Sequence, residues 1–215
     1  TGTITENRLS YKNDYLINNS SFHPLVLSRL AAHDLKERNP EPFDLASDQA
    51  LSEDQRSEVA TYQLIEEESF DPDLRSNGAV VRRSDGLTLH IRRGSPEYFF
   101  ERNLVDQELV AGWLQDEENQ GRRVLGVSYD DGSGERFGGF VSFADTLKTT
   151  TASVIKSAQE MNVAITIITG DSLRVAEAVG RETGLVHVVG EVMEAKEFFA
   201  LSPVEQHKLV GKIRV

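Results

Sequence analysis

The chain of 215 residues contains no cysteine, which excludes disulfides, thiolate zinc sites and cysteine nucleophiles together. It contains no run of 18 or more apolar residues, so we expect no segment of it to span a bilayer. Its five histidines are scattered, and no HExxH or similar metal-ligand cluster occurs. These absences leave a globular chain whose chemistry must come from carboxylates, hydroxyls, backbone amides and a few cations.

Basic residues are also scarce, with 23 lysines and arginines against 35 acidic residues and a net charge of -12. An acidic chain is repelled by phosphate polymers, so we expect no nucleic-acid partner. One small phosphate ligand can still bind where backbone amides or a metal ion override the net charge. Apolar residues make up 39% of the chain, which is enough for one core or two small ones.

Residues 11–137 show the signals of a mainly antiparallel module. Branched residues at 79–83 and 87–91 flank Ser84-Asp85-Gly86, a turn sequence typical of a hairpin. Further strands are expected at 123–129 and 138–143. Helices are expected at 23–37, from residue 44 to 50, and from residue 97 to about 113.

The last third alternates between helical and strand patterns. An amphipathic helix is expected at 149–162, and the apolar run at 163–168 is typical of a parallel strand buried on both faces. A helix at 173–183, a strand at 185–189 and a helix at 203–212 follow. This order predicts a doubly wound parallel sheet. Residues 1–10 read as a loop. We therefore predict an α/β domain from residues 1–10 and 138–215, with residues 11–137 inserted as an α+β domain.

The strongest local signal for chemistry is Thr169-Gly170-Asp171, at the predicted junction of a strand and a helix. Ligands bind at the carboxyl ends of parallel strands, and helix amino ends favour anions. Thr169 could donate to a phosphoryl oxygen, and Asp171 could orient a lysine or a metal-bound water. The alternative is an ordinary turn with an aspartate cap, which is a common arrangement.

Two further segments could contact a phosphate ligand. In Arg93-Gly94-Ser95-Pro96-Glu97, the glycine lets a ligand approach the backbone and the arginine could pair with phosphate. A plain strand-to-helix connection is the alternative. In residues 70–76, Phe70 could stack on a purine with Arg75 near its phosphates, or Phe70 could simply be core.

Other phosphate and nucleophile motifs are absent. The sequence has no GxxxxGK(S/T) loop, no GxGxxG spacing and no serine in a nucleophile elbow. From these residues alone, a generic sugar- or nucleotide-phosphate-binding α/β protein remains possible.

Taken in order, however, the motifs resemble those of P-type ATPases. The opening Thr1-Gly2-Thr3-Ile4-Thr5 resembles the end of the DKTGT(L/I)T signature, and Thr169-Gly170-Asp171 matches the TGD motif at all three positions. The other similarities are residues 41–46 to DPxDxA, 70–76 to F-(S/D)-x-x-x-(K/R)-(S/R), 93–97 to KGxPE, and 145–148 to D-P-(P/L)-(R/K).

Several of these matches depart from the family pattern. Glu41 replaces the first aspartate of DPxDxA, and Asp44 or alternatively Asp48 would hold its second acidic position. Arg93 replaces the usual lysine, and residues 145–148 lack the proline but keep the cation as Lys148. Six motifs in the family's order nevertheless favour membership over chance.

The resemblance implies a fold and a set of roles. The ends of the chain would form part of a haloacid-dehalogenase-like domain, and ATP with Mg²⁺ would bind the inserted module. Phe70 would stack on adenine, and Asp44 would face the nucleotide. Arg75 and Arg93 would lie near the phosphates, with Gly94 next to Arg93 in the KGxPE-like motif. The carbonyl of Thr1 would coordinate Mg²⁺, and Thr3 and Thr169 would contact the phosphoryl group. Lys148 and Asp171 would support the closed state, and Gly170 belongs to the site as the middle residue of the Thr-Gly-Asp motif.

The implied whole protein is an ATP-driven cation pump that forms an aspartyl-phosphate, and this chain would be its segment on the cytoplasmic face of a membrane. Its partners would be the transmembrane and actuator parts of the same polypeptide. The phosphorylated aspartate is expected just before residue 1, and the FAR-x-x-P-x-x-K and GDGxNDxP motifs after residue 215. We therefore expect this chain to bind ATP weakly and to be inactive alone.

The transported ion is not specified by these residues, since its ligands would lie on membrane helices. The DPxD-like element favours a calcium, magnesium or proton pump. Ser21-Phe22-His23-Pro24-Leu25 resembles the SEHPL motif of heavy-metal pumps, but it lacks the glutamate, and the paired GxG motif is missing.

Two rival hypotheses predict different chemistry. One is a haloacid-dehalogenase-like phosphatase with the middle module as a cap. It would need an aspartate two residues after the nucleophile, where Thr1 falls. The other is a non-catalytic nucleotide-binding module with a regulatory role.

Overall fold

The computed structural model describes residues 2–17, 20–32, 41–188 and 190–215. The chain divides into two compact units. Unit 1 consists of Thr1–Asn7, Asp116–Arg123 and Asp145–Val215, and unit 2 consists of Arg8–Gln115 and Val124–Ala144. The predicted split into phosphorylation and nucleotide-binding domains stays a prediction.

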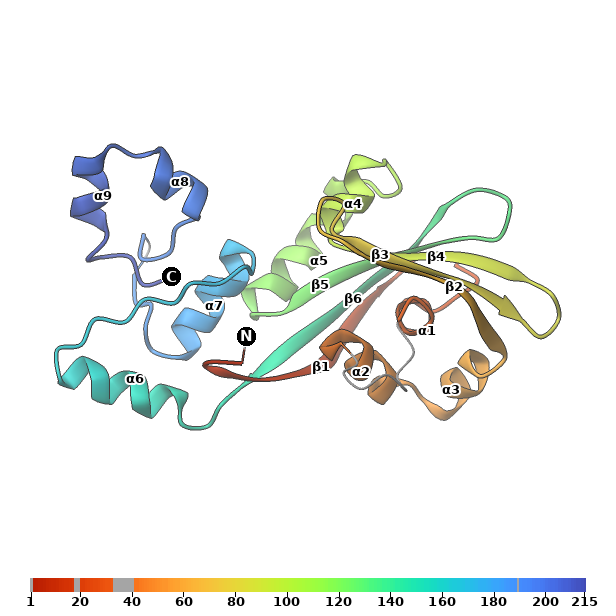
Figure 1. Cartoon of the computed structure of the whole chain (residues 1–215), viewed down its shortest axis with the longest axis horizontal. Helices are drawn as coiled ribbons and strands as arrows, with labels where there is room; N and C mark the ends of the chain where they lie inside the picture. The colour runs from red at the N-terminus through yellow and green to blue at the C-terminus, as the bar shows by residue number, and fades with distance from the viewer. Residues whose placement is uncertain (1, 18–19, 33–40, 189) are drawn as a thin grey trace. The chain divides into compact units, whose positions relative to one another are not determined.

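Unit 2 is built on a six-stranded sheet with the order β1-β6-β5-β4-β3-β2 (Figure 1). The pairs from β2 to β5 run antiparallel. Ser10 Oγ contacts Ala144 O, and Ser142 Oγ contacts Asn13 O, so β1 also runs antiparallel to β6. The strands are β1 (Thr5–Leu16), β2 (Tyr62–Asp71), β3 (Ser76–Arg83), β4 (Thr88–Gly94), β5 (Arg123–Asp130) and β6 (Arg136–Leu147).

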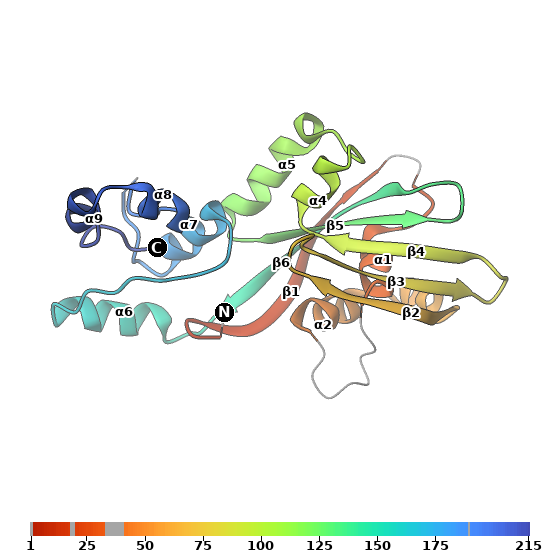
Figure 2. The same cartoon turned by 45° about the horizontal axis from the view of Figure 1, so that its top comes forward.

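Helices cover both faces of this sheet (Figures 1 and 2). Side chains alternate between the two faces of a strand, so Leu89 and Ile91 of β4 share one face. They pack in one core with α1 (Pro24–Leu30) and α2 (Pro42–Ala50), and α3 (Glu53–Val59) lies on the same side. The opposite face is covered by α4 (Pro96–Glu101) and α5 (Gln107–Asn119), where Phe99 packs with Phe140.

Unit 1 contains α6 (Thr151–Glu160), α7 (Leu173–Glu182), α8 (Ala195–Ala200) and α9 (Pro203–Leu209). Ser172 caps α7 by accepting from Val175 N, as expected for a serine before a helix. The buried core of unit 1 is small, with Ala176, Val186 and Val215 at its centre.

The structure confirms most of the predicted elements of the middle module. The hairpin around Asp85-Gly86 is β3 and β4, and the expected strands at 123–129 and 138–143 are β5 and β6. The expected helices correspond to α1, α2, α4, α5, α6, α7 and α9. Residues 33–37 of the first predicted helix lie outside the described residues. The loop expected at residues 1–10 is wrong, because residues from Thr5 onward form β1 alongside β6.

The parallel strands expected in the last third are also wrong. Residues 163–168 and 185–188 form no strand, and Val189 lies outside the described residues. Residues 163–168 are tied to the chain's end by Ile167 N, which donates to Arg214 O at 2.8 Å, but they form no ladder. Ile168 is 95% exposed, so this apolar run does not lie inside a sheet. An apolar run becomes a buried strand only where neighbouring strands pair with it. A haloacid-dehalogenase-like sheet is therefore not seen in the described residues.

Candidate functional site

The predicted site residues fall into two groups, one in each unit. Unit 2 holds Asp44, Phe70, Arg75, Arg93 and Gly94. Unit 1 holds Thr3, Lys148, Thr169, Gly170 and Asp171, while Thr1 lies outside the described residues.

Asp44 and Arg93 form an ion pair inside unit 2. The distance between Arg93 Nη1 and Asp44 Oδ1 is 2.7 Å, and the two side chains are 3% and 0% exposed. Arg93 also donates from Nε to Asn77 Oδ1 at 3.2 Å and from Nη1 to Ser28 O at 3.3 Å. This buried network joins α1, α2, β3 and β4, so the two charges are directed at each other.

Asp48, the alternative to Asp44, is likewise engaged with arginines. Its carboxylate pairs with Arg29 Nε at 2.8 Å and with Arg56 Nη1 at 3.2 Å. Burial alone would raise the pKa of Asp48, but the hydrogen bonds from Arg29 and Arg56 outweigh it and lower that pKa below its usual value. Asp48 therefore holds α1, α2 and α3 together.

Phe70, Arg75 and Gly94 come together at one end of the sheet. The register places Asp71 opposite Ser76, and Ser76 opposite Gly94. Phe70 lies at this end of β2 and is 53% exposed. Arg75 has a positive φ of 51°, and its carbonyl accepts from Ser95 N at 3.0 Å.

Gly94 is required by this close approach of β4 to the turn. A Cβ added at Gly94 would lie 2.8 Å from Arg75 O and 2.8 Å from Ser76 Cβ. Side chains larger than hydrogen would therefore push the Arg75 turn away. The predicted role of Gly94 in ligand approach is untested, but its packing role is clear.

Two buried hydroxyls beside Gly94 lack a hydrogen-bond partner among the described residues. They are Ser76 Oγ, in a fully buried residue, and Ser95 Oγ. Ser95 is the N-cap of α4 and yet its side chain accepts no capping bond. Buried polar groups are nearly always paired, so unpaired hydroxyls at this end of the sheet are consistent with a polar ligand nearby.

In unit 1, Lys148 is brought onto the opening segment of the chain. Its ammonium donates to Gly2 O and to Thr3 O, both at 2.8 Å. The backbone continues the contact, since Lys148 N donates to Ile4 O at 3.0 Å and Thr151 Oγ1 donates to the same carbonyl at 2.7 Å. Two predicted motifs that are about 145 residues apart in sequence are therefore in direct contact.

Thr169, Gly170 and Asp171 form a compact turn before α7. Thr169 Oγ1 donates to Asp171 Oδ2 at 2.9 Å and accepts from Asp171 N at 3.2 Å. Arg123 pairs with the same carboxylate of Asp171, with Nε 2.6 Å from Oδ1 and Nη2 3.0 Å from Oδ2. This bidentate pair is part-exposed, at 21% for Arg123 and 20% for Asp171.

Sequence reasoning missed Arg123. The Arg122-Arg123 doublet precedes a strand in an acidic chain, which is a weak signal. Nothing in the local sequence links it to an aspartate 48 residues later.

An apolar groove of about 730 Å³ adjoins the Thr169-Gly170-Asp171 turn within unit 1. Its walls include Ile168, Leu173, Met193, Phe198 and Phe199. The polar residues of the turn therefore line the groove together with apolar side chains. Such a combination suits a site that binds a charged group and excludes water around it.

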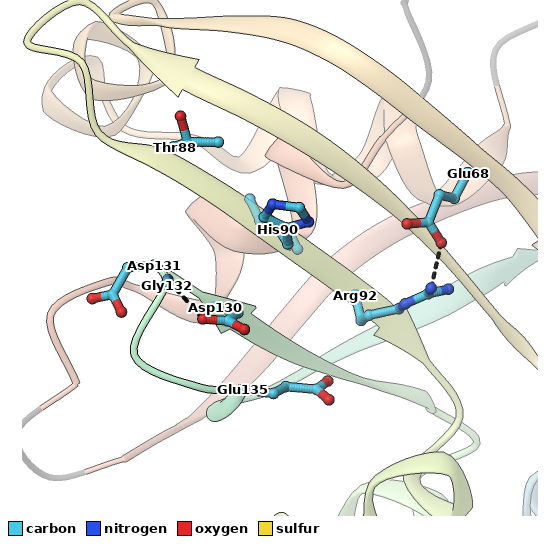
Figure 3. A pocket seen from close by; sticks show the side chains of 9 residues that line it. Glu68, Thr88, His90, Arg92, Asp130, Asp131, Gly132 and Glu135 are labelled. Carbon is cyan, nitrogen blue, oxygen red and sulfur yellow. Dashed lines mark hydrogen bonds and ion pairs between the residues drawn. The ribbon is translucent and has the colours of Figure 1, made fainter.

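A second, smaller cavity of about 330 Å³ in unit 2 is lined by residues of β4 and of the turn between β5 and β6 (Figure 3). Several acidic side chains line it, and they are already engaged. Glu68 pairs with Arg92, and Asp130 Oδ1 accepts from the amides of Gly132 and Gly134. Glu135 accepts from Ser128 Oγ at 2.6 Å. Over the described residues, no group of three or more His, Asp or Glu side chains is placed to hold a metal ion.

Comparison of the sequence with known proteins finds similarity to P-type ATPases. No family model matches the chain. It is 26% identical over 195 residues to Plasma membrane ATPase 1 of Schizosaccharomyces pombe, and 27% identical over the same length to Plasma membrane ATPase 2 of Saccharomyces cerevisiae. Both matches cover 86% of this chain and 21% of the relative. A Copper-exporting P-type ATPase of Bacillus subtilis is 31% identical over 93 residues, which is 43% of this chain and 11% of that protein.

The chain is related to P-type ATPases. This relationship confirms the resemblance inferred from the motifs. The chain spans about a fifth of the length of the plasma membrane ATPases that it matches. No helix in the described part of this P-type ATPase relative is long and apolar enough to cross a membrane.

Proposed function

We propose that this chain is the nucleotide-binding module and part of the phosphorylation domain of an ATP-driven cation pump of the P-type. The whole protein would couple ATP hydrolysis, through an aspartyl-phosphate, to ion transport, with this segment on the cytoplasmic face of a membrane. Transmembrane and actuator parts of the same polypeptide would be its partners. The haloacid-dehalogenase-like fold of the phosphorylation domain belongs to the same proposal.

The observation that carries the proposal is the contact of Lys148 with Gly2 and Thr3. A segment at one end of the sequence and a motif in its last third lie in one compact unit. That is the arrangement expected if the opening Thr-Gly-Thr and the Asp145–Lys148 motif serve one phosphoryl-transfer centre. The similarity to plasma membrane ATPases over 86% of the chain supports the same assignment.

The residues of unit 2 fit a nucleotide in part. Phe70 offers an exposed ring, which can stack on adenine, and Arg75 is an exposed cation five residues later. The unpaired hydroxyls of Ser76 and Ser95 supply polar groups at the same end of the sheet. Asp44 and Arg93, in contrast, are buried against each other. We therefore assign them to the floor of the site and Phe70, Arg75 and Gly94 to its mouth.

The described residues do not form a site for Mg²⁺, since no cluster of acidic or histidine ligands occurs among them. The carbonyl of Thr1, predicted to coordinate the ion, lies outside the described residues. We derive no step through the metal from this chain.

In unit 1 we assign roles around a transferred phosphoryl group. Thr169 would donate its hydroxyl to a phosphoryl oxygen, with Gly170 giving room for close approach. Asp171 would hold Arg123 through its carboxylate, and its backbone amide would still position Thr169 Oγ1 when the threonine hydroxyl turns from the Asp171 carboxylate to the phosphoryl oxygen. Thr3 would contact the same group, and Lys148 would fix the backbone that carries Thr3.

Titration of the ¹⁵N-labelled chain with ATP tests the nucleotide site. We expect amide shifts centred on Phe70, Arg75 and Gly94, and a loss of affinity of roughly tenfold for Phe70→Ala, since base–aromatic stacking contributes about 1–3 kcal/mol. Leu109→Ala is the control, because Leu109 is an exposed apolar residue on α5 and is not a proposed site residue. No shift in residues 70–94 at millimolar ATP would contradict the nucleotide site.

The same experiment separates the alternatives. Shifts confined to residues 169–171, produced by inorganic phosphate but not by ATP, would favour the phosphatase. Nucleotide binding without phosphate effects in unit 1 would favour a non-catalytic module. We also expect this chain alone to form no stoichiometric acid-stable phosphoenzyme with labelled ATP, and a clear phosphoenzyme would contradict that expectation.

A further inference from the structure

The last strand of the sheet in unit 2 has a partner on one side only. β2 (Tyr62–Asp71) pairs with β3 and ends the strand order of the described sheet. Its ten residues extend for roughly 33 Å, and the side away from β3 presents a row of backbone N–H and C=O groups. Such a row is a template on which another extended segment can pair.

Side chains along this edge are exposed to an unusual extent. Residues 63–67 are all exposed, although they alternate between the two faces of the sheet, so neither face is covered there. Leu64 is 39% exposed and Ile65 is 48% exposed. A register shift between Leu64 and Glu66 takes Ile65 out of the ladder with β3. These two apolar side chains can anchor an incoming segment.

Charge decides what can pair with the edge. β2 carries Glu66, Glu67, Glu68 and Asp71 and no basic residue. Glu68 is ion-paired with Arg92, but the strand remains net negative. A second copy pairing through the same residues would oppose glutamates to glutamates, which is unfavourable directly across strands. The acidic edge therefore selects against self-association and favours a basic segment.

The opposite edge of the sheet is different. β1 (Thr5–Leu16) carries Glu6 and Asp14 together with Arg8 and Lys12, so its charges balance. It offers no comparable preference for a basic segment, and it serves as an internal control.

From the unpaired edge, the exposed apolar pair and the one-sided charge, we propose that β2 is a docking edge for an extended segment of a partner protein in which basic and apolar residues alternate. The segment adds a seventh strand beside β2. Its backbone pairs with the free edge, its apolar residues contact Leu64 and Ile65, and its cations face the glutamates. The anchors Leu64 and Ile65 take no part in the proposed nucleotide site, whereas Phe70, the proposed adenine contact, lies further along the same strand.

Amide hydrogen exchange of the 215-residue chain tests this docking. The probe is a short peptide of alternating lysine and valine, and the control peptide has glutamate in place of lysine. We expect the basic peptide to slow exchange at alternate residues of β2, with weaker binding at higher salt, and the acidic peptide to have no effect. Absence of β2 protection at millimolar basic peptide, or protection of β1 instead, would overturn the proposal.

Two charge-reversal variants sharpen the test. Glu66→Lys should weaken binding of the basic peptide by roughly fivefold, since an attractive cross-strand pair becomes repulsive. Glu160→Lys makes the same charge change at the end of α6 in unit 1 and should leave binding within twofold. Equal losses in both variants would mean that the peptide binds through net charge alone. Protection of β2 that grows with protein concentration in the absence of peptide would mean that a second copy is the occupant. Either result contradicts the proposal.

Discussion

Two arginine–aspartate pairs involve predicted site residues, one pair in each unit, and the pairs differ in their surroundings. Arg93 and Asp44 in unit 2 are 2.7 Å apart and almost completely buried. Arg123 and Asp171 in unit 1 are 2.6 Å apart and about one-fifth exposed. Their lengths are nearly equal, so the distance alone does not distinguish them.

Burial gives the pairs different uses. Removing two charges from water is costly, and the buried pair recovers that cost only through its attraction and the extra bonds to Asn77 and Ser28. Asp44 and Arg93 therefore fix the positions of α2 and β4. The exposed pair keeps some solvent, so a phosphate oxygen could replace the carboxylate of Asp171 on Arg123 at modest cost. The buried pair of Asp44 and Arg93 is suited to holding the fold, and the part-exposed pair of Arg123 and Asp171 is suited to binding a phosphate in place of the carboxylate.

The largest effect that separates the two pairs is expected for unfolding. Arg93→Met leaves the carboxylate of Asp44 buried without its cation and should lower the free energy of unfolding by about 3–5 kcal/mol. Arg123→Met removes a part-exposed pair and should lower it by about 1 kcal/mol or less. Urea unfolding of the three proteins measures both values.

A double variant distinguishes a lost charge pair from lost packing. Asp44→Leu combined with Arg93→Met removes both buried charges, so it should recover most of the stability lost in Arg93→Met. Equal stability of the Arg93→Met and Arg123→Met variants would contradict the contrast drawn here.

A pair of glycine substitutions tests the close approach of β4 to the Arg75 turn. Gly94→Ala places a methyl group 2.8 Å from Arg75 O and should destabilise unit 2 by about 1–3 kcal/mol while shifting the amide signals of residues 70–76. Gly112→Ala lies inside α5, where an added Cβ meets nothing within 4 Å, and should stabilise by up to about 1 kcal/mol. Thermal unfolding measures the changes in stability, and amide spectra measure the shifts of residues 70–76. A Gly94→Ala variant with unchanged stability would show that the Arg75 turn can move to accept the methyl group.

Local features of the sequence predicted local structure well. Asp85-Gly86 predicted the β3–β4 turn, where Leu87 N donates to the Asp85 carboxylate, and the helical pattern at 173–183 predicted α7. The motifs also predicted relatedness to P-type ATPases. These signals succeed because they depend on neighbours within a few residues.

The failures concern contacts between distant residues. The apolar run at 163–168 predicted a buried strand, but burial depends on partner strands that the run itself does not encode. The motif containing Arg93 did not indicate that its side chain pairs with Asp44 in the core, and the predicted role of Arg93 near phosphate stays a prediction. Arg123 was missed for the same reason, since its partner is 48 residues away.

A smaller effect is expected when phosphate competes for the part-exposed pair of Arg123 and Asp171. In the chain with Arg123 intact, inorganic phosphate should shift the amide signals of Thr169, Gly170 and Asp171, because the anion competes with Asp171 for the guanidinium. Arg123→Met should abolish most of this response while changing stability little. If phosphate instead perturbs Asp44 and Arg93, the buried pair is the labile one and the comparison is reversed.

The smallest effect is expected for the intermediate case, Asp48, which is 27% exposed between two arginines. Asp48→Asn should lower the free energy of unfolding by about 0.5–1 kcal/mol near neutral pH. The pKa of Asp48 is lowered in the folded chain, so its contribution is fully present above the ordinary value of 3.8 and is lost as the pH falls through the lower folded value. The difference in unfolding free energy between the unsubstituted chain and Asp48→Asn should therefore shrink only below pH 3.8. Asp73→Asn, an exposed change in the β2–β3 turn, is the control and should leave the unfolding free energy unchanged. A difference that persists unchanged to pH 2 would mean that the side-chain amide, rather than the loss of charge, destabilises α2.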